Sequence, residues 1–202
     1  DVRLSNTTRY GYAVRDSVYS APRFLNTTTT LIRAQPQSRD TVDKILLNQS
    51  NVFAKFETGG IRHDAIAGFE VSWERSRNQL RTVTDATPTD LFDPDPERPW
   101  SGTIVDIPGA VVRAKADTVA AYVFDTVHFS DQLLLTGGVR WERYKSEFQA
   151  APPSSRLSRT DEHFTWRAGL TYKPVPNLSL YAGAGTSVDP SIENMTQTNV
   201  TP

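Results

Sequence analysis

Residues 164–173 alternate strictly between two kinds of side chain. The even positions, from Phe164 to Tyr172, are apolar or aromatic, and the odd positions, which include Arg167 and Lys173, are small or polar. A period of two places successive side chains on opposite faces of a β-strand, so one face is apolar and the other is wet. The alternation lasts for about ten residues. Ordinary strands average about five or six residues, whereas a strand that crosses a bilayer needs about 9–11, so the length favours a membrane-spanning strand.

The two-faced pattern recurs along almost the whole chain. Alternating segments occupy residues 2–15, 44–58, 65–74, 133–142, 164–173 and 178–185. Residues 116–129 are a further predicted strand, but both of its faces are fairly apolar and its facing is not assigned. We therefore expect an all-β domain, an antiparallel meander of about seven long strands, or about eight if residues 26–34 also form one. Apolar residues make up 38% of the chain. No stretch approaches the roughly 18 apolar residues that a spanning helix needs, which excludes a helical membrane protein.

The connections between these segments alternate in length. Short turns are predicted at 59–60, 130–132 and 174–177, and long loops at 16–43, 78–113, 149–161 and from 188 onward. The segment 16–43 is either a loop or a strand extension that rises out of a membrane. In a meander every second connection lies at the same end, so the short turns share one rim. Outer-membrane barrels have short periplasmic turns and long extracellular loops, and the sorting therefore predicts part of a transmembrane β-barrel.

The two faces of such a barrel wall have different surroundings. The polar face, which carries Arg167 and Lys173, would line a lumen, and the apolar face would meet lipid. Aromatic residues near strand ends predict interfacial girdles. They are Trp73, Trp141, Tyr144, Trp166 and Tyr172. Cross-strand packing inside a soluble core would account for the same aromatic residues.

Composition argues against several classes of function. The net charge of −1 gives no electrostatic basis for binding nucleic acid. The chain has no cysteine, so it relies on neither disulfides nor thiolate metal sites. Its three histidines, His63, His128 and His163, lie on separate segments, and we expect no metal centre. No catalytic constellation stands out, so we expect neither an enzyme nor a bound cofactor.

Short motifs follow one another along nearly the whole chain. They occupy residues 6–11, 58–63, 67–70, 91–96, 116–122, 124–126, 137–141, 166–174, 179–181 and 185–187. In this order they resemble the β-barrel of TonB-dependent siderophore receptors of Gram-negative outer membranes, and most closely the ferric-catecholate-like branch. Each motif is weak alone because barrel strands resemble one another, but together they are fairly specific.

The resemblance implies a barrel of roughly 22 strands with a plugged lumen. Residues 1–202 would then be a partial barrel domain, without the N-terminal plug and the terminal strands, and part of a longer protein. The implied function is a receptor in the cell outer membrane of a Gram-negative bacterium that imports ferric siderophores. The implied partners are the ferric siderophore, outer-membrane lipid and a TonB-type energy-coupling protein, which would act through the missing N-terminal region.

Ligand binding in such a receptor would use cations and aromatic rings of the extracellular loops. A guanidinium suits an anionic ferric chelate because it donates several hydrogen bonds in a fixed plane. The candidate binding residues are Arg98, Trp100, Arg81, Arg113 and Arg156. Arg98 and Trp100 are the main hypothesis because a cation and a large aromatic ring lie close together in the longest well-defined loop.

Two other functions fit the residue pattern. A soluble β-sandwich, for example a carbohydrate-binding module, would use the same long loops as its site. A passive porin-like channel would use the same barrel wall. Detergent extraction from an outer-membrane fraction would separate the membrane barrel from the soluble module. Expressed alone, the chain is expected to aggregate through its open strand edges.

Overall fold

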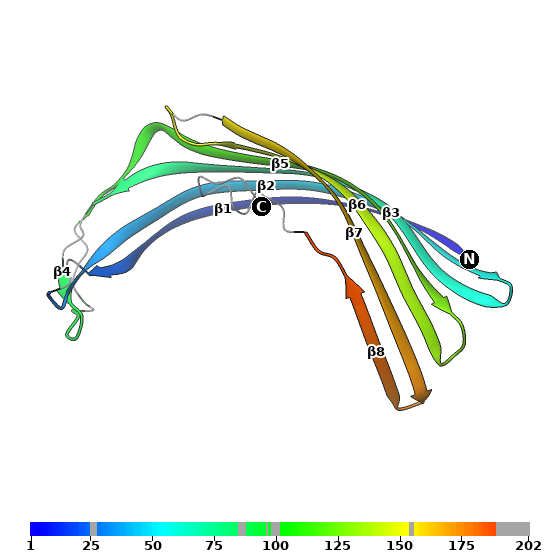
Figure 1. Ribbon diagram of the computed structural model, residues 1–202. Coiled ribbons are helices and arrows are strands. Elements are labelled where there is room, and N and C mark those ends of the chain that lie inside the picture. The colour runs from blue at the N-terminus through cyan, green and yellow to red at the C-terminus, as the bar shows by residue number, and fades with distance from the viewer. Residues whose placement is uncertain (25–27, 85–87, 96, 98–101, 154–155, 189–202) are drawn as a thin grey trace.

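A computed structural model describes residues 1–24, 28–84, 88–95, 97, 102–153 and 156–188. Their regular structure consists of β-strands. The strands are β1 (Val2–Phe24), β2 (Leu31–Thr58), β3 (Ile61–Val83), β4 (Pro88–Asp90), β5 (Ile104–His128), β6 (Leu133–Gln149), β7 (Arg156–Val175) and β8 (Leu178–Gly185). Together they form one curved sheet that arches like a section of a wide cylinder (Figure 1). No helix in these described ranges is long and apolar enough to cross a membrane.

The sheet is an antiparallel meander. Seven strands follow the order β1-β2-β3-β5-β6-β7-β8, and the short β4 pairs with β2. The predicted all-β meander of seven or eight strands is therefore confirmed. The alternative of a β-sandwich is wrong, because a sandwich needs two sheets packed face to face and the described strands belong to a single sheet.

The strands are much longer than the alternation predicted. Most of the described residues in the predicted loops 16–43, 78–113 and 149–161 are strand, because β1 and β3 continue to Phe24 and Val83 while β5 begins at Ile104. The strand-extension alternative for 16–43 is thus confirmed. Residues 28–34, the described part of the predicted strand 26–34, do not form a separate spanning strand, since Leu31 already opens β2. Where both faces of a strand are solvated, the hydrogen-bonded ladder needs no apolar face, and the period of two disappears from the sequence.

The short and long connections lie at opposite rims, as predicted. At the short-turn rim, Gly59 and Gly60 join β2 to β3 with φ angles of 60° and 82°. These left-handed values are easy for glycine, which has no Cβ. The turns between β5 and β6 and between β7 and β8 lie at the same rim, and β4 lies at the long-loop rim (Figure 1).

The outer face of the sheet carries an apolar band. Cross-strand pairing places one row of six side chains from neighbouring strands on this face. The row consists of Leu4, Val52, Ala67, Val123, Val139 and Trp166. Phe164 and Trp73, on the same face, are 64% and 43% exposed. Large apolar side chains without cover on one face of a sheet are the pattern of a barrel wall that meets lipid.

Tyr144 departs from the predicted aromatic girdle. It lies opposite Thr118 and Asp161 on the inner face and is only 7% exposed. The other four predicted girdle aromatics share the outer face. The reason is parity: Tyr144 follows the outward-facing Trp141 by three residues, and an odd spacing reverses the face.

Two glycines on the inner face make room for aromatic rings. A Cβ atom at Gly68 would overlap the ring of Tyr122, and one at Gly138 would overlap the ring of Phe124 and the carbonyl oxygen of Val123. Each ring therefore lies across the neighbouring strand. This packing between glycines and aromatic rings stiffens a single sheet that has no second sheet to pack against.

Gly138→Ala is therefore expected to destabilise the barrel wall by about 1–3 kcal/mol, because the added methyl group displaces the Phe124 ring and meets backbone. The matched control is Gly137→Ala on the outer face, where the nearest atom would be 3.9 Å from the new Cβ. The measurement is the urea midpoint of unfolding of the receptor, produced from its complete gene. Equal midpoints for the two variants would contradict the packing argument.

Candidate functional site

The inner face carries a cluster of charges at mid-height, centred on Arg140 of β6. Arg140 Nη2 lies 3.0 Å from Glu70 Oε1 of β3, and Arg140 Nε lies 2.9 Å from Glu142 Oε2. Its guanidinium also lies over the ring of Tyr122, 5.6 Å from the ring centroid. One cation thus joins two carboxylates from two strands.

Tyr122 of β5 extends this cluster towards β2. Its hydroxyl donates a hydrogen bond to Asn51 Oδ1 at 2.5 Å and accepts one from Gln49 Nε2 at 2.6 Å. The ring reaches β2 across β3 because Gly68 leaves space beneath it. The network therefore crosses four strands and pairs its polar groups with one another.

This inner lining is suited to a polar lumen rather than to chemistry. Its carboxylates are held by a guanidinium, and its amides and phenol are paired with one another. A nucleophile would need an adjacent base that is free to accept a proton. What the wall offers instead is a fixed array of donors and acceptors that can face water or a plug.

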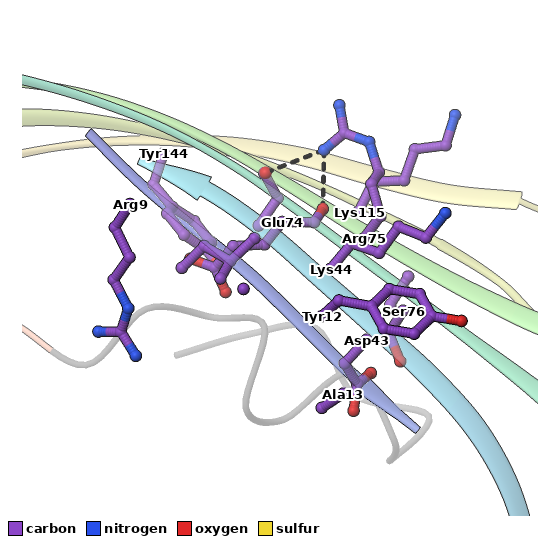
Figure 2. Close-up of a pocket in the computed structure, with 14 residues that line it drawn as sticks. Arg9, Tyr12, Ala13, Asp43, Lys44, Glu74, Arg75, Ser76, Lys115 and Tyr144 are labelled. Carbon is purple, nitrogen blue, oxygen red and sulfur yellow. Dashed lines mark hydrogen bonds between the residues drawn. The ribbon is translucent and has the colours of Figure 1, made fainter. Parts of the chain in front are cut away.

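A hollow of about 530 Å³ lies in the wall closer to the long-loop rim (Figure 2). Small residues from three strands, β1, β3 and β5, contribute to it because they leave the wall thin there. They include Gly11, Ala13, Ser76, Ala114 and Ala116. Arg9 and Tyr144 border the hollow on the inner side. The hollow therefore combines an apolar floor with a nearby cation.

Arg81 of β3 holds three carboxylates together beyond the apolar band. Its guanidinium lies 2.6 Å from Asp16 of β1, 3.2 Å from Asp40 of β2 and 3.0 Å from Asp106 of β5. The hydrogen bond from Arg81 holds the pKa of the Asp16 carboxyl below its usual 3.8. Arg81 was predicted as a loop residue that contacts ligand. It is instead a strand residue whose charge is already matched by carboxylates.

The other candidate residues lie in different places. Arg98 and Trp100 lie outside the described residues. Arg113 is an exposed residue of β5, and Arg156 opens β7 and pairs with Glu147. Their predicted location in loops is therefore wrong, because the strands extend further than the alternation suggested. The role of all five candidates in ligand binding stays a prediction.

The histidines have separate partners. His63 Nδ1 lies 2.6 Å from Asp125 and its ring stacks on Phe56, whereas His128 Nε2 lies 2.9 Å from Asp64. His63 and His128 are on opposite faces of the sheet, because their positions have opposite parity in the paired register. In the part of the chain that the structure describes, no group of three or more His, Cys, Asp or Glu residues could hold a metal ion.

The fold and its polar inner lining agree with comparisons to known proteins. A family model described as "TonB dependent receptor-like, beta-barrel" matches residues 1–202. The chain belongs to this family. Membership places it in the outer membrane of a Gram-negative bacterium, with the short-turn rim in the periplasm and the long-loop rim outside the cell.

Individual relatives agree with this membership. The chain is 30% identical over 94% of its length to the "Probable TonB-dependent receptor BfrD" of Bordetella pertussis, and 26% identical over 76% to the "Catecholate siderophore receptor Fiu" of Escherichia coli strain K12. The crystal structure of the open form of Fiu has a TM-score of 0.81, at 23% identity over 94% of the chain. The chain spans 29% of BfrD and 23% of the Fiu sequence, and therefore corresponds to part of the barrel of these receptors.

Sequence reasoning missed the cluster around Arg140 and Tyr122. The alternation separates a polar face from an apolar face in β3 and β6, and Glu70, Arg140 and Glu142 lie on the polar one, but the facing of residues 116–129, which include Tyr122, was not predicted. The missing information was the register, which places Tyr122 of β5 opposite Arg140 of β6 on one side and opposite Gly68 of β3, two residues from Glu70, on the other. A signal was available in the glycines: Gly68 and Gly138 stand in otherwise regular strands, where glycine often marks a close approach.

The Asp16–Arg81 pair predicts a pH dependence. Because the folded-state pKa of Asp16 is below 3.8, its stabilising contribution is complete above that value and is lost as the pH falls through the folded-state pKa. The unfolding midpoints of the unmodified receptor and Arg81→Gln should therefore differ at about pH 6, and the difference should shrink at about pH 2.5. For the control Arg77→Gln, the difference in unfolding midpoint from the unmodified receptor should not shrink in this way between about pH 6 and about pH 2.5. A difference for Arg81→Gln that is equal at both pH values would refute the coupling.

Proposed function

We propose that this chain forms part of the barrel of an outer-membrane receptor that imports ferric siderophores with TonB-derived energy. The match of the family model to residues 1–202 carries the proposal. The naming of Fiu as a catecholate siderophore receptor supports a catecholate-type ferric chelate as the ligand. The wall contributes selective passage and anchoring in lipid.

The proposal includes no catalytic step and no resident cofactor. Iron enters as cargo in its chelate, and energy comes from a TonB-type partner at the periplasmic side. The Arg140 cluster supports a wall that passes cargo without reacting with it, because a polar wall with its charges already paired suits contact with water or a plug domain. A passive porin-like channel is the competing function, and it differs in needing no energy coupling.

Uptake of iron supplied as a ferric catecholate tests the proposed function. In cells whose only receptor for this chelate is the one encoded by the complete gene, uptake should saturate with chelate concentration. It should stop when the energy-coupling protein is removed. Uptake that rises linearly with concentration and persists without the coupling protein would support the porin-like channel instead. A ferric hydroxamate, supplied in parallel, tests the assignment to catecholates.

The double variant Arg98→Ala with Trp100→Ala is predicted to weaken binding of the ferric catecholate by about tenfold or more, as for arginine and tryptophan anchors at other interfaces. The control is Arg143→Ala, an exposed cation that pairs with Glu162 at 3.5 Å on the outer face. Binding is measured with purified receptor by quenching of intrinsic fluorescence. Unchanged affinity in the double variant would refute a role for this loop in capture.

A further inference from the structure

The outer face changes character above the apolar band. On β2 the outward-facing positions from Phe56 to Leu46 are apolar except for Asn48 and Ser50, which form hydrogen bonds with Asn6 of β1. They cover about ten residues, which corresponds to about 33 Å along the strand and about 25 Å along the membrane normal at the tilt of barrel strands. This is the height of the hydrocarbon-facing band of an outer-membrane barrel. The next outward-facing residue of β2 is Lys44, which therefore lies at the level of the lipid headgroups on the extracellular side.

Cations from three neighbouring strands occupy this level. Lys44 of β2 lies opposite Arg75 of β3, which lies opposite Lys115 of β5. One row further out, Arg77 of β3 lies opposite Arg113 of β5. Figure 2 shows Lys44, Arg75 and Lys115 extending to the same side of the sheet, away from Arg9. We call these five residues the outer basic cluster.

Carboxylates match only part of this charge. Arg75 lies 2.6 Å from Asp117, and Lys115 lies 3.9 Å from Glu147, which also pairs with Lys145 and Arg156. Arg77 and Arg113 form no ion pair with any of the described residues. Like charges directly opposite each other destabilise a strand pair. Repulsion between the exposed Arg77 and Arg113 side chains therefore destabilises this strand pair, and a bound anion would relieve that repulsion.

The cluster also surrounds a recess. A hollow of about 460 Å³ is lined by all five cations together with Val42, Ser76 and Ala114. Ser76 and Ala114 lie opposite each other between the two rows of cations, and because their side chains point to the inner face, the recess between the rows has a floor of backbone. Below the recess, on the same face, Leu46 and Trp73 begin the apolar band and are 41% and 43% exposed. A ligand here would meet cations above and an apolar surface below.

We propose that the outer basic cluster binds the phosphate-bearing headgroup of a lipid in the outer leaflet. Guanidinium and ammonium groups bind phosphate through charge-assisted hydrogen bonds, and Arg77 and Arg113 can both donate to one phosphate. The acyl chains then lie along the apolar band beside Trp73. A free phosphate would use only the cations, whereas an amphiphile also uses the adjoining apolar surface. The proposal rests on the membrane placement of the family, and not on the transport of iron.

The test is native mass spectrometry of the receptor, produced from its complete gene and stripped of lipid in detergent. The probe is lipid A, a bisphosphorylated glycolipid, and the parallel probes are its dephosphorylated form and inorganic phosphate. Lipid A should bind, and the dephosphorylated form should bind at least tenfold more weakly. Equal binding of lipid A and its dephosphorylated form would overturn the conclusion that the site recognises phosphate. Binding of inorganic phosphate as tight as that of lipid A would overturn the assignment to a lipid.

The double variant Arg77→Gln with Arg113→Gln should weaken lipid A binding by about twentyfold, given the contribution of each cation near a charged membrane surface. Arg77→Lys with Arg113→Lys should retain most of the affinity, because it keeps both charges. The matched control is Arg9→Gln with Arg15→Gln, which removes two exposed arginines from the inner face of β1. All variants are first checked for a folded barrel by heat-modifiable mobility on a gel. Equal weakening in the control, or none in the folded Arg77/Arg113 glutamine variant, would refute the site.

Discussion

Backbone hydrogen bonding in the absence of water is the constraint on which the rest of this structure depends. A strand in hydrocarbon must pair its N–H and C=O groups with neighbouring strands, because lipid offers no partner. The unbroken registers of β1 with β2 and of β2 with β3 meet this requirement across the apolar band. Among the strands that the structure describes, β1 and β8 each pair on one side only. The chain is thus a section of a larger closed wall, in agreement with its share of the length of its relatives.

Once the ladder is formed, a single sheet must gain rigidity without a second layer. The inner face does so by laying Tyr122 and Phe124 across strands over Gly68 and Gly138, and by joining Glu70 and Glu142 through Arg140. These contacts bridge strands that are distant in sequence. The wall therefore combines an outer surface fitted to lipid with an inner surface whose central charged cluster is paired internally.

The surroundings of an arginine side chain differ with its height and its face in the wall. Arg140 is enclosed by carboxylates in the lumen lining, and Arg81 is enclosed by three of them beyond the membrane. Arg77 and Arg113, by contrast, face each other on the outside at the level of the headgroups. Residue type alone does not separate these cases. The first two are paired with carboxylates of the wall itself, and the last two form the core of a lipid-binding proposal.

The sequence by itself determined the class of fold, the two faces of most strands, the sorting of the rims and the family, because the period of two is a local property of a strand. Residues 116–129 are the exception, since both of their faces are fairly apolar. It failed for the strand extensions, since a ladder in water needs no alternation, and for Tyr144, which an odd spacing turns inward. Only the tertiary structure decided which residues lie opposite one another. Arg77 and Arg113 are separated by a long connection, and no local pattern records their pairing. A shift of one residue in register would have reversed the faces, so the apolar band and the register had to be resolved together.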